Sequence, residues 1–216
     1  MFTLPKSTEF NKRIPKQKFY NHLTLSPTLK KVFTEQIDTI IWKNKIAPST
    51  LSLAAGKKVT EIEVFEVNLR SELKDDSVLR QIDKEIPYHI LFILKYLDKS
   101  QAWIGYKEES SGNTAFKVSA YYHTEWETDD DLTLSVDGLD MDAVYENFVR
   151  QISGGRLDKA DVTESLKNSV ERDEVRKKLQ KQINALEKKS RAEKQWNLQM
   201  EIDEKIRKLK KEMEKI

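Results

Sequence analysis

Residues 88–97, YHILFILKYL, are almost continuously apolar and decide the fold of this chain. A run of this kind is typical of a central strand that is buried on both faces of a sheet. Pro87 precedes the run, and Asp98-Lys99-Ser100 supplies a tight turn after it. The segment therefore predicts the middle of a sheet.

Strand patterns lie on both sides of this segment. Residues 37–46 (IDTIIWKNKI) and 60–69 (TEIEVFEVNL) precede it, and residues 101–107 (QAWIGYK) and 116–126 (FKVSAYYHTEW) follow it. All four are rich in β-branched and aromatic residues. Leu132, Leu134 and Val136 alternate in the same way after an acidic turn. Because the turns between successive strands are short, we expect antiparallel pairing.

Helical patterns flank the strands. Residues 16–23 predict a short helix, and Ser26-Pro27 supplies the N-cap and first-position proline of a second helix that ends near residue 36. Amphipathic patterns predict further helices over residues 77–86 and 141–152. Residues 1–158 are therefore predicted to be an α+β domain, a mostly antiparallel sheet flanked by helices.

Residues 159–216 are predicted to be a charged helical or coiled-coil extension. From Asp161 onward there is no proline or glycine. Two arrangements stay open: one long helix of roughly 75 Å, or a helical hairpin that folds back near Ser190. The apolar seam needs a partner, because a lone polar helix is marginal in water. The residues expected at an interface with a partner, or with a second copy in a homodimer, are Trp196, Ile202, Ile206, Leu209 and Met213.

The composition excludes several classes of protein. Hydrophobic residues make up 38% and charged residues 34% of the chain, and cysteine is absent, which excludes disulfides, thiolate metal sites and cysteine nucleophiles. There is no apolar run of membrane-spanning length and no signal-peptide core at the start. We expect a cytoplasmic protein without membrane contact.

The net charge of +2 hides three blocks. Residues 1–58 carry 11 Lys/Arg against 3 Asp/Glu, a balance of +8. Residues 59–165 carry 11 against 23, a balance of −12, and residues 166–216 carry 16 against 10, a balance of +6. Because electric fields are local, a basic segment can attract an acidic partner while the middle repels it.

The first basic block opens with an arm, punctuated by Pro5 and Pro15, that we expect to be irregular. Cations that neutralise phosphates, beside aromatic rings that stack on bases, are typical of nucleic-acid binding. The alternative is a solvated arm that docks on the acidic middle of the same chain. The candidate nucleic-acid-binding residues are Lys6, Lys12, Arg13, Lys16, Lys18, Phe19 and Tyr20.

Two groups of residues are candidates for catalysis. Glu61 and Glu63 share one strand face, with Glu66 on the other unless a bulge intervenes, and paired carboxylates can hold Mg²⁺ for phosphodiester hydrolysis. The alternative role for these glutamates is to protect a sheet edge or face a partner. His123 and Glu125 are the second group, a possible metal or acid–base pair whose alternative is a polar cluster on the sheet surface.

The sequence contains no motif for calcium binding or for nucleotide binding. The run Asp129–Asp131 has neither the ligand spacing nor the glycine of a calcium loop, and is interpreted as a solvated turn. There is no G-x-x-x-x-G-K and no G-x-G-x-x-G, which disfavours an ATPase or a nucleotide-dependent oxidoreductase. No cofactor is expected, apart from Mg²⁺ if the chain is a nuclease.

The segments LPKSTEFNKRIPKQKFY, IIWKNKIAPSTLSL, IDKEIPYHILFIL and VYENFVRQI resemble an uncharacterised prokaryotic family, the domain of unknown function 4391. The resemblance covers almost the whole chain. It implies a protein encoded beside DNA methyltransferases and helicases of restriction and phage-defence loci. It supplies no catalytic residues.

These observations favour a non-catalytic accessory subunit of a DNA restriction or phage-defence system. Such a subunit would bind DNA, a partner methyltransferase or helicase, or both. The alternatives are a divergent metal-dependent nuclease using Glu61, Glu63 and Glu66, and a structural coiled-coil scaffold.

Overall fold

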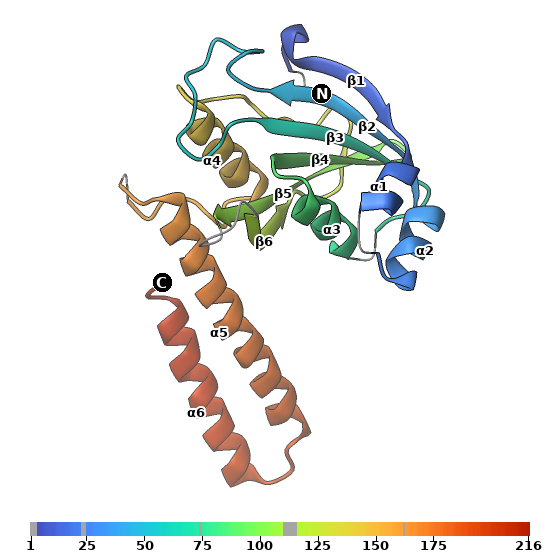
Figure 1. The fold of residues 1–216 in the computed structure, drawn as a ribbon. Coiled ribbons are helices and arrows are strands. Elements are labelled where there is room, and N and C mark those ends of the chain that lie inside the picture. Colours follow the sequence, from blue (N-terminus) through green and yellow to red (C-terminus); the bar gives the residue numbers. More distant parts are fainter. Residues whose placement is uncertain (1–3, 23–24, 74, 110–115, 162) are drawn as a thin grey trace. The chain divides into compact units, whose positions relative to one another are not determined.

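A seven-stranded, mostly antiparallel sheet organises the first 155 residues (Figure 1). The computed structural model describes residues 4–22, 25–73, 75–109, 116–161 and 163–216, which divide into two compact units, Met1–Gly155 and Arg156–Ile216. The strands, in spatial order, are β1 (Glu9–Ile14), β2 (Ile37–Ile46), β3 (Ile62–Leu69), β4 (His89–Tyr96), β5 (Lys99–Glu109) and β6 (Phe116–His123), with β7 (Glu127–Thr128) also paired to β5.

The predicted central strand is confirmed. β4 lies between β3 and β5, and its first six residues are buried. Its pairing with β3 is parallel, whereas the other neighbouring strands pair antiparallel. The parallel pair follows from the helix between the two strands, because a crossover returns the chain to the same end of the sheet.

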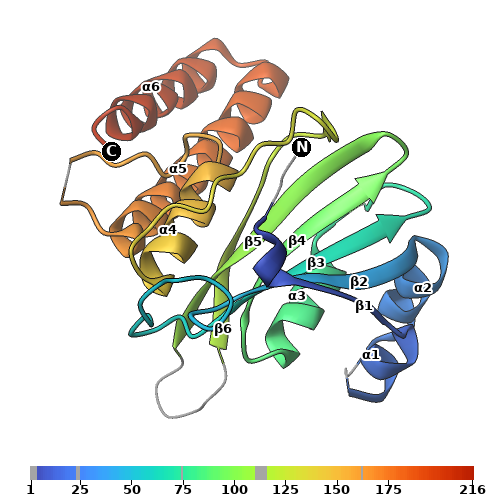
Figure 2. The same ribbon diagram turned by 90° about the horizontal axis from the view of Figure 1, so that it is seen from above.

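Helices cover both faces of the sheet (Figure 2). On one face the core includes Phe65, Val67, Phe92 and Leu94, which pack with residues of three helices. Side chains alternate along a strand, so the other face carries the intervening residues; there the ring of His89 lies 4.3 Å from that of Tyr145. The helices on the first face are α1 (Lys16–His22), α2 (Pro27–Glu35) and α3 (Ser77–Glu85), and α4 (Met141–Ile152) lies on the second. The predicted α+β class is therefore correct, and Ser26 caps α2 as expected by accepting a hydrogen bond from the Leu29 N–H at 3.2 Å.

The structure corrects two predicted segments. The arm expected to be irregular contains a short 3₁₀ helix, η1 (Lys6–Thr8), and β1, which pairs with β2. The register of this pair shifts between Glu9 and Lys12, and Asn11 has φ of +48°. Conversely, residues 132–138 alternate in hydropathy without forming a strand. Leu132 is buried there, so burial of single residues produced the pattern.

The second unit is a helical hairpin. α5 (Leu166–Ala192) and α6 (Trp196–Met213) lie side by side, joined by three residues (Figure 1). Ile183, Ile202 and Ile206 are buried between the helices, and Ser190 Oγ donates to Asp203 Oδ1 at 2.7 Å. Of the two arrangements that the sequence leaves open, the hairpin is the observed one.

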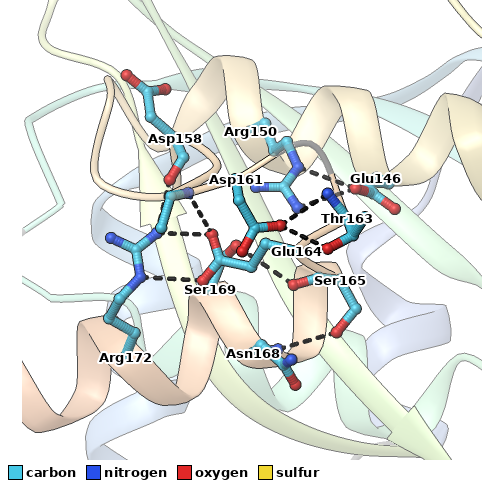
Figure 3. A network of polar contacts seen from close by, with 11 residues as sticks. Glu146, Arg150, Asp158, Asp161, Thr163, Glu164, Ser165, Asn168, Ser169 and Arg172 are labelled. Atoms are coloured by element: carbon cyan, nitrogen blue, oxygen red, sulfur yellow. Dashed lines mark hydrogen bonds and ion pairs between the residues drawn. The ribbon is translucent and has the colours of Figure 1, made fainter. Parts of the chain in front are cut away.

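The turn that leads into α5 is held by polar contacts (Figure 3). Arg172 Nε and Nη2 each lie 3.0 Å from a carboxylate oxygen of Glu164, and Nη2 donates to the Asp158 carbonyl at 2.6 Å. Ser165 caps the helix by accepting from the Asn168 N–H at 3.2 Å. The Ser165 bond satisfies one of the backbone N–H groups that the first helical turn leaves without a partner, and the Arg172 bonds fix the segment before it.

No helix in the described part of the chain is long and apolar enough to cross a membrane.

Candidate functional site

A pocket with excess positive charge lies where β1 ends and α1 begins. We call it the cationic pocket; its volume is about 550 Å³, and it is lined by Arg13, Ile14, Pro15, Lys16, Asp38, Thr39 and Arg70. Three cations and one carboxylate give the lining a net charge of +2. The arrangement suits an anion, because the positive charges converge on one concavity.

Strand register builds one side of the cationic pocket. Just past the end of β3, the Arg70 N–H donates to the Gln36 carbonyl at 2.7 Å. The β2–β3 register shifts between Ile37 and Thr39, so Asp38 lies at the same end of the strand pair as Arg70. Arg70 donates to Asp38 Oδ1 through Nη2 at 2.7 Å and through Nε at 3.1 Å. These hydrogen bonds hold the pKa of Asp38 below its usual range.

Lys16 and Arg13 build the other side. The Lys16 ammonium donates to the Ile37 carbonyl. Partial burial, followed by repulsion from Arg70 and Arg13, lowers the pKa of Lys16, against the opposing effect of Asp38. The Arg13 guanidinium has no hydrogen-bond or ion-pair partner within residues 4–22, 25–73, 75–109, 116–161 and 163–216. The cations therefore repel one another and are only partly neutralised.

The remaining predicted cations lie around this pocket or along β1. Lys12 Nζ sits 4.3 Å above the centre of the Phe10 ring, and the centre of that ring lies 4.0 Å from the centre of the Trp42 ring of β2, with the two rings tilted by 39°. Lys6 in η1 and Lys18 in α1 are exposed. Of the five predicted cations, the structure brings Arg13 and Lys16 together in one pocket.

Two of the predicted base-stacking residues are part of the core instead. Phe19 is only 6% exposed, and its ring lies 5.6 Å from Phe33 of α2. Tyr20 is half-buried, with its ring 5.8 Å from Phe33 and its hydroxyl 3.4 Å from Thr34 Oγ1. α1 must bury one side against the sheet and α2, and these rings form that side. Phe19 is therefore not available at the surface to stack on a base. The aromatic rings that lie beside Lys12 are those of Phe10 and Trp42.

The three glutamates of the nuclease hypothesis do not form one site. β3 pairs with β4 without a register shift over Ile62–Asn68, so no bulge turns Glu66 toward Glu61 and Glu63. Glu61 Oε2 lies 2.5 Å from Lys45 Nζ, whereas Glu66 Oε2 lies 3.7 Å from Lys43 Nζ. β3 is also an interior strand, so the alternative of edge protection is wrong.

Glu63 is an unusual carboxyl group. It is 2% exposed, and neither of its oxygens has a hydrogen-bond partner of good geometry in the described part of the chain. Burial, and then the neighbouring Glu61, raise its pKa to about 8, although Lys45 lowers it. At neutral pH Glu63 is therefore protonated, which is a poor state for a metal ligand.

Glu66 lines a second pocket, on the other face of the sheet. Its volume is about 440 Å³, and it contains two ion pairs, Lys43–Glu66 at 3.7 Å and Lys95–Asp129 at 3.1 Å. Asp129 also accepts a hydrogen bond from the Ser100 hydroxyl, so it is more than the solvated turn residue predicted from the sequence. With Glu9, three carboxylates face two lysines in this pocket, which gives it no attraction for an anion.

His123 and Glu125 do not form a pair on one strand face. β6 ends at His123, so the alternation does not reach Glu125. The His123 ring stacks on Trp103 at 4.4 Å, and its Nδ1 lies 2.8 Å from the Thr124 carbonyl. The arrangement matches the alternative of a polar cluster on the sheet.

The most buried charges belong to Asp83 of α3 and Lys107 of β5. Lys107 Nζ lies 2.8 Å from Asp83 Oδ1, both side chains are 0% exposed, and Tyr121 donates its hydroxyl to the same carboxylate. Gly105 gives them room, because a Cβ there would lie 2.5 Å from Asp83 Oδ2. Burial raises the pKa of Asp83 and lowers that of Lys107. With no access to solvent, this pair holds α3 on the sheet.

The predicted interface residues divide between the interior and the surface of the hairpin. Ile202 and Ile206 are buried against α5, and Leu209 and Met213 pack beside them. The apolar side of α6 therefore packs against α5 of the same chain. Trp196 is 71% exposed at the start of α6.

Sequence reasoning missed Arg70 as a site residue. Arg70 directly follows β3, the strand that contains Glu63 and Glu66. A single cation at the end of a strand does not by itself indicate a binding site. The information needed was the pairing of β2 with β3, which brings the Arg70 side chain within 2.7 Å of Asp38. No group of three or more histidines, aspartates or glutamates in the described part of the chain is placed to hold a metal ion.

Comparison with known proteins places the chain in a family. Residues 2–213 match the family model described as Domain of unknown function (DUF4391), so the chain belongs to that family. No curated protein and no solved structure matches it.

Proposed function

We propose that this protein is a non-catalytic, cytoplasmic accessory subunit of a DNA restriction or phage-defence system, and that it binds the DNA backbone through β1, α1 and the cationic pocket. The observation that carries the DNA contact is the convergence of Arg13, Lys16 and Arg70 beside a single carboxylate. Lys12 and the Phe10–Trp42 rings extend the surface along β1. Backbone binding needs such cations and little else.

Salt dependence of DNA binding tests this proposal. Labelled duplex DNA is titrated with the protein between about 50 and 200 mM salt and followed by fluorescence anisotropy. We expect affinity to fall steeply with salt, and the variant with Lys12, Arg13, Lys16 and Lys18 changed to Gln to lose roughly one unit of log–log slope for each phosphate contact removed. The matched control changes four exposed hairpin lysines to Gln: Lys178, Lys181, Lys188 and Lys189. Absence of binding at low salt, or equal loss in both variants, would refute the DNA contact.

The protein partner implied by the family resemblance is a DNA methyltransferase or a helicase. The hairpin supports this half of the proposal, because Trp196 is 71% exposed and Leu198 and Met200 beside it are 41% and 49% exposed. Co-purification with the neighbouring methyltransferase and helicase, using wild type and Trp196→Ala, tests it. Retention of neither enzyme by the wild-type protein would contradict it.

A further inference from the structure

We propose that the cationic pocket binds a terminal phosphate monoester of a nucleic-acid strand. This inference rests on the proposed function and makes it more specific, because it names the part of the nucleic acid that enters the pocket. Arg70 and Asp38, which the sequence did not suggest as binding residues, belong to the pocket together with Arg13 and Lys16.

Charge is the first reason. The pocket lining has a net charge of +2. A phosphate monoester carries about −1.5 to −2 charges near pH 7, whereas each internal phosphodiester carries a single negative charge. Three cations around one concavity therefore complement a terminal phosphate better than one internal phosphate of a continuous strand.

The donors are the second reason. The Arg13 guanidinium is without a partner in the part of the chain that the structure describes, and it can present two parallel N–H groups to phosphate oxygens. Arg70 directs Nε and Nη2 to Asp38 and contacts the Thr34 carbonyl through Nη1 at 3.4 Å. Thr39 adds a hydroxyl to the lining. A monoester presents three terminal oxygens for such a set of donors.

Size and preorganisation are the third reason. A volume of about 550 Å³ is larger than a phosphate needs, and lies within the range of pockets that take nucleotide-sized ligands. Lys16 is anchored by the Ile37 carbonyl and Arg70 by Asp38, so two of the cations are positioned before a ligand arrives. Partial burial, and then repulsion from Arg70 and Arg13, lowers the pKa of Lys16, and a bound anion would relieve that repulsion.

The experiment compares ends of one oligonucleotide. Anisotropy titrations use the same short DNA strand with a 5′-phosphate, a 3′-phosphate or hydroxyls at both ends, and the wild-type full chain. We expect one phosphorylated end to bind roughly tenfold more tightly than the hydroxyl form. Which of the two ends gains identifies the polarity. Inorganic phosphate at millimolar concentration should abolish the difference.

Variants connect the effect to the pocket. Arg13→Gln should remove most of the preference for the phosphorylated end, and it leaves the fold intact because Arg13 has no partner among residues the structure describes. Arg70→Gln should do the same. Lys117→Gln, an exposed cation on the opposite edge strand β6, is the matched control and should keep the preference.

The outcomes separate the two proposals. Equal binding of all three strands, with normal salt dependence, overturns the terminal-phosphate inference and leaves the DNA contact standing. A preference that survives Arg13→Gln and Arg70→Gln overturns it as well. Failure of all three strands to bind refutes the proposed DNA contact, and the inference with it.

Discussion

The Asp83–Lys107 pair and the cationic pocket are built from the same kinds of residue and differ in two respects. The side chains of Asp83 and Lys107 are 0% exposed and carry opposite charges that balance, and the lysine also donates to the carbonyls of Asp83, Ile86 and Tyr88. In the cationic pocket the side chains of Arg70 and Asp38 are 56% and 48% exposed, and two further cations have no carboxylate of their own.

A structural ion pair and a pocket able to hold a ligand differ in how their charges are balanced. A buried pair must be balanced and hydrogen-bonded, since each unpaired charge in the interior costs several kcal/mol. An open pocket can keep an excess of charge, because water solvates it until a ligand arrives. Access and charge imbalance therefore point to function more directly than the presence of titratable groups.

Lys107→Met breaks the buried pair and should have the largest effect. It leaves the Asp83 carboxylate buried without its counter-charge, so we expect the free energy of unfolding to fall by about 3–5 kcal/mol. Urea unfolding followed by circular dichroism measures the change. The double variant Asp83→Asn, Lys107→Met should recover part of the loss, because no buried charge remains. A single variant as stable as wild type would show that the pair is not structural.

Glu63→Gln tests a carboxyl group that lies between the two extremes, buried but only partly compensated by Lys45. The unfolded chain releases this proton near the ordinary pKa of 4.5, whereas the folded chain keeps it to about pH 8. The folded state therefore binds more protons in this window, and the contribution of Glu63 to the free energy of unfolding falls as pH rises from 4.5 to 8. Gln lacks this loss.

We therefore expect the free energy of unfolding of Glu63→Gln to gain on that of wild type progressively, by roughly 3–4 kcal/mol between pH 5 and pH 8. Unfolding in urea at pH 5, 6.5 and 8 measures the difference, and Glu61→Gln, which removes the neighbouring carboxylate that is paired with Lys45, is the comparison variant. A constant difference between Glu63→Gln and wild type at all three pH values would contradict the raised pKa.

Asp38→Asn perturbs the open pocket and should have the smallest effect on folding. An exposed ion pair contributes little to stability, so the thermal midpoint should move by less than about 2 °C. Binding should respond in the opposite sense: removal of the only carboxylate raises the net charge of the pocket to +3, and affinity for phosphorylated DNA should rise a few-fold at low salt. A weaker affinity would mean that Asp38 positions Arg70 more than it competes with the ligand.

Much of the fold was predictable, because local patterns and burial agree over most of the sheet. β2 and α4 have the predicted bounds, and β4 is the central strand. β1 was missed because its buried residues do not alternate: Phe10 and Ile14 are half-buried and the rest are exposed, with a register shift between them. The sequence could not decide between one long helix and a hairpin. Polar residues around Ser190 interrupt the apolar pattern, but there is no proline or glycine there to mark the end of α5.

The site was predictable only in part. Arg13 and Lys16 stood out through the charge of the first block, but their convergence with Arg70 depends on the pairing of β2 with β3, across more than 30 residues of chain. Phe19 was misassigned because the sequence does not distinguish two roles for an aromatic residue in a basic segment. The ring can stack on a base, or it can belong to the buried side of a short helix. Tertiary packing against Phe33 decided between them.

The left-handed Asn11 in β1 has a consequence for how copies of this protein meet at high concentration. β1 is an edge strand of the sheet, and an edge strand can act as a template on which another molecule adds a strand of its own. A residue at φ of +48° beside a register shift interrupts the regular spacing of backbone donors and acceptors along that strand, and Lys12 adds a charge at the same point. We expect this short segment, which carries Lys12 and Arg13, to disfavour polymerisation through the sheet.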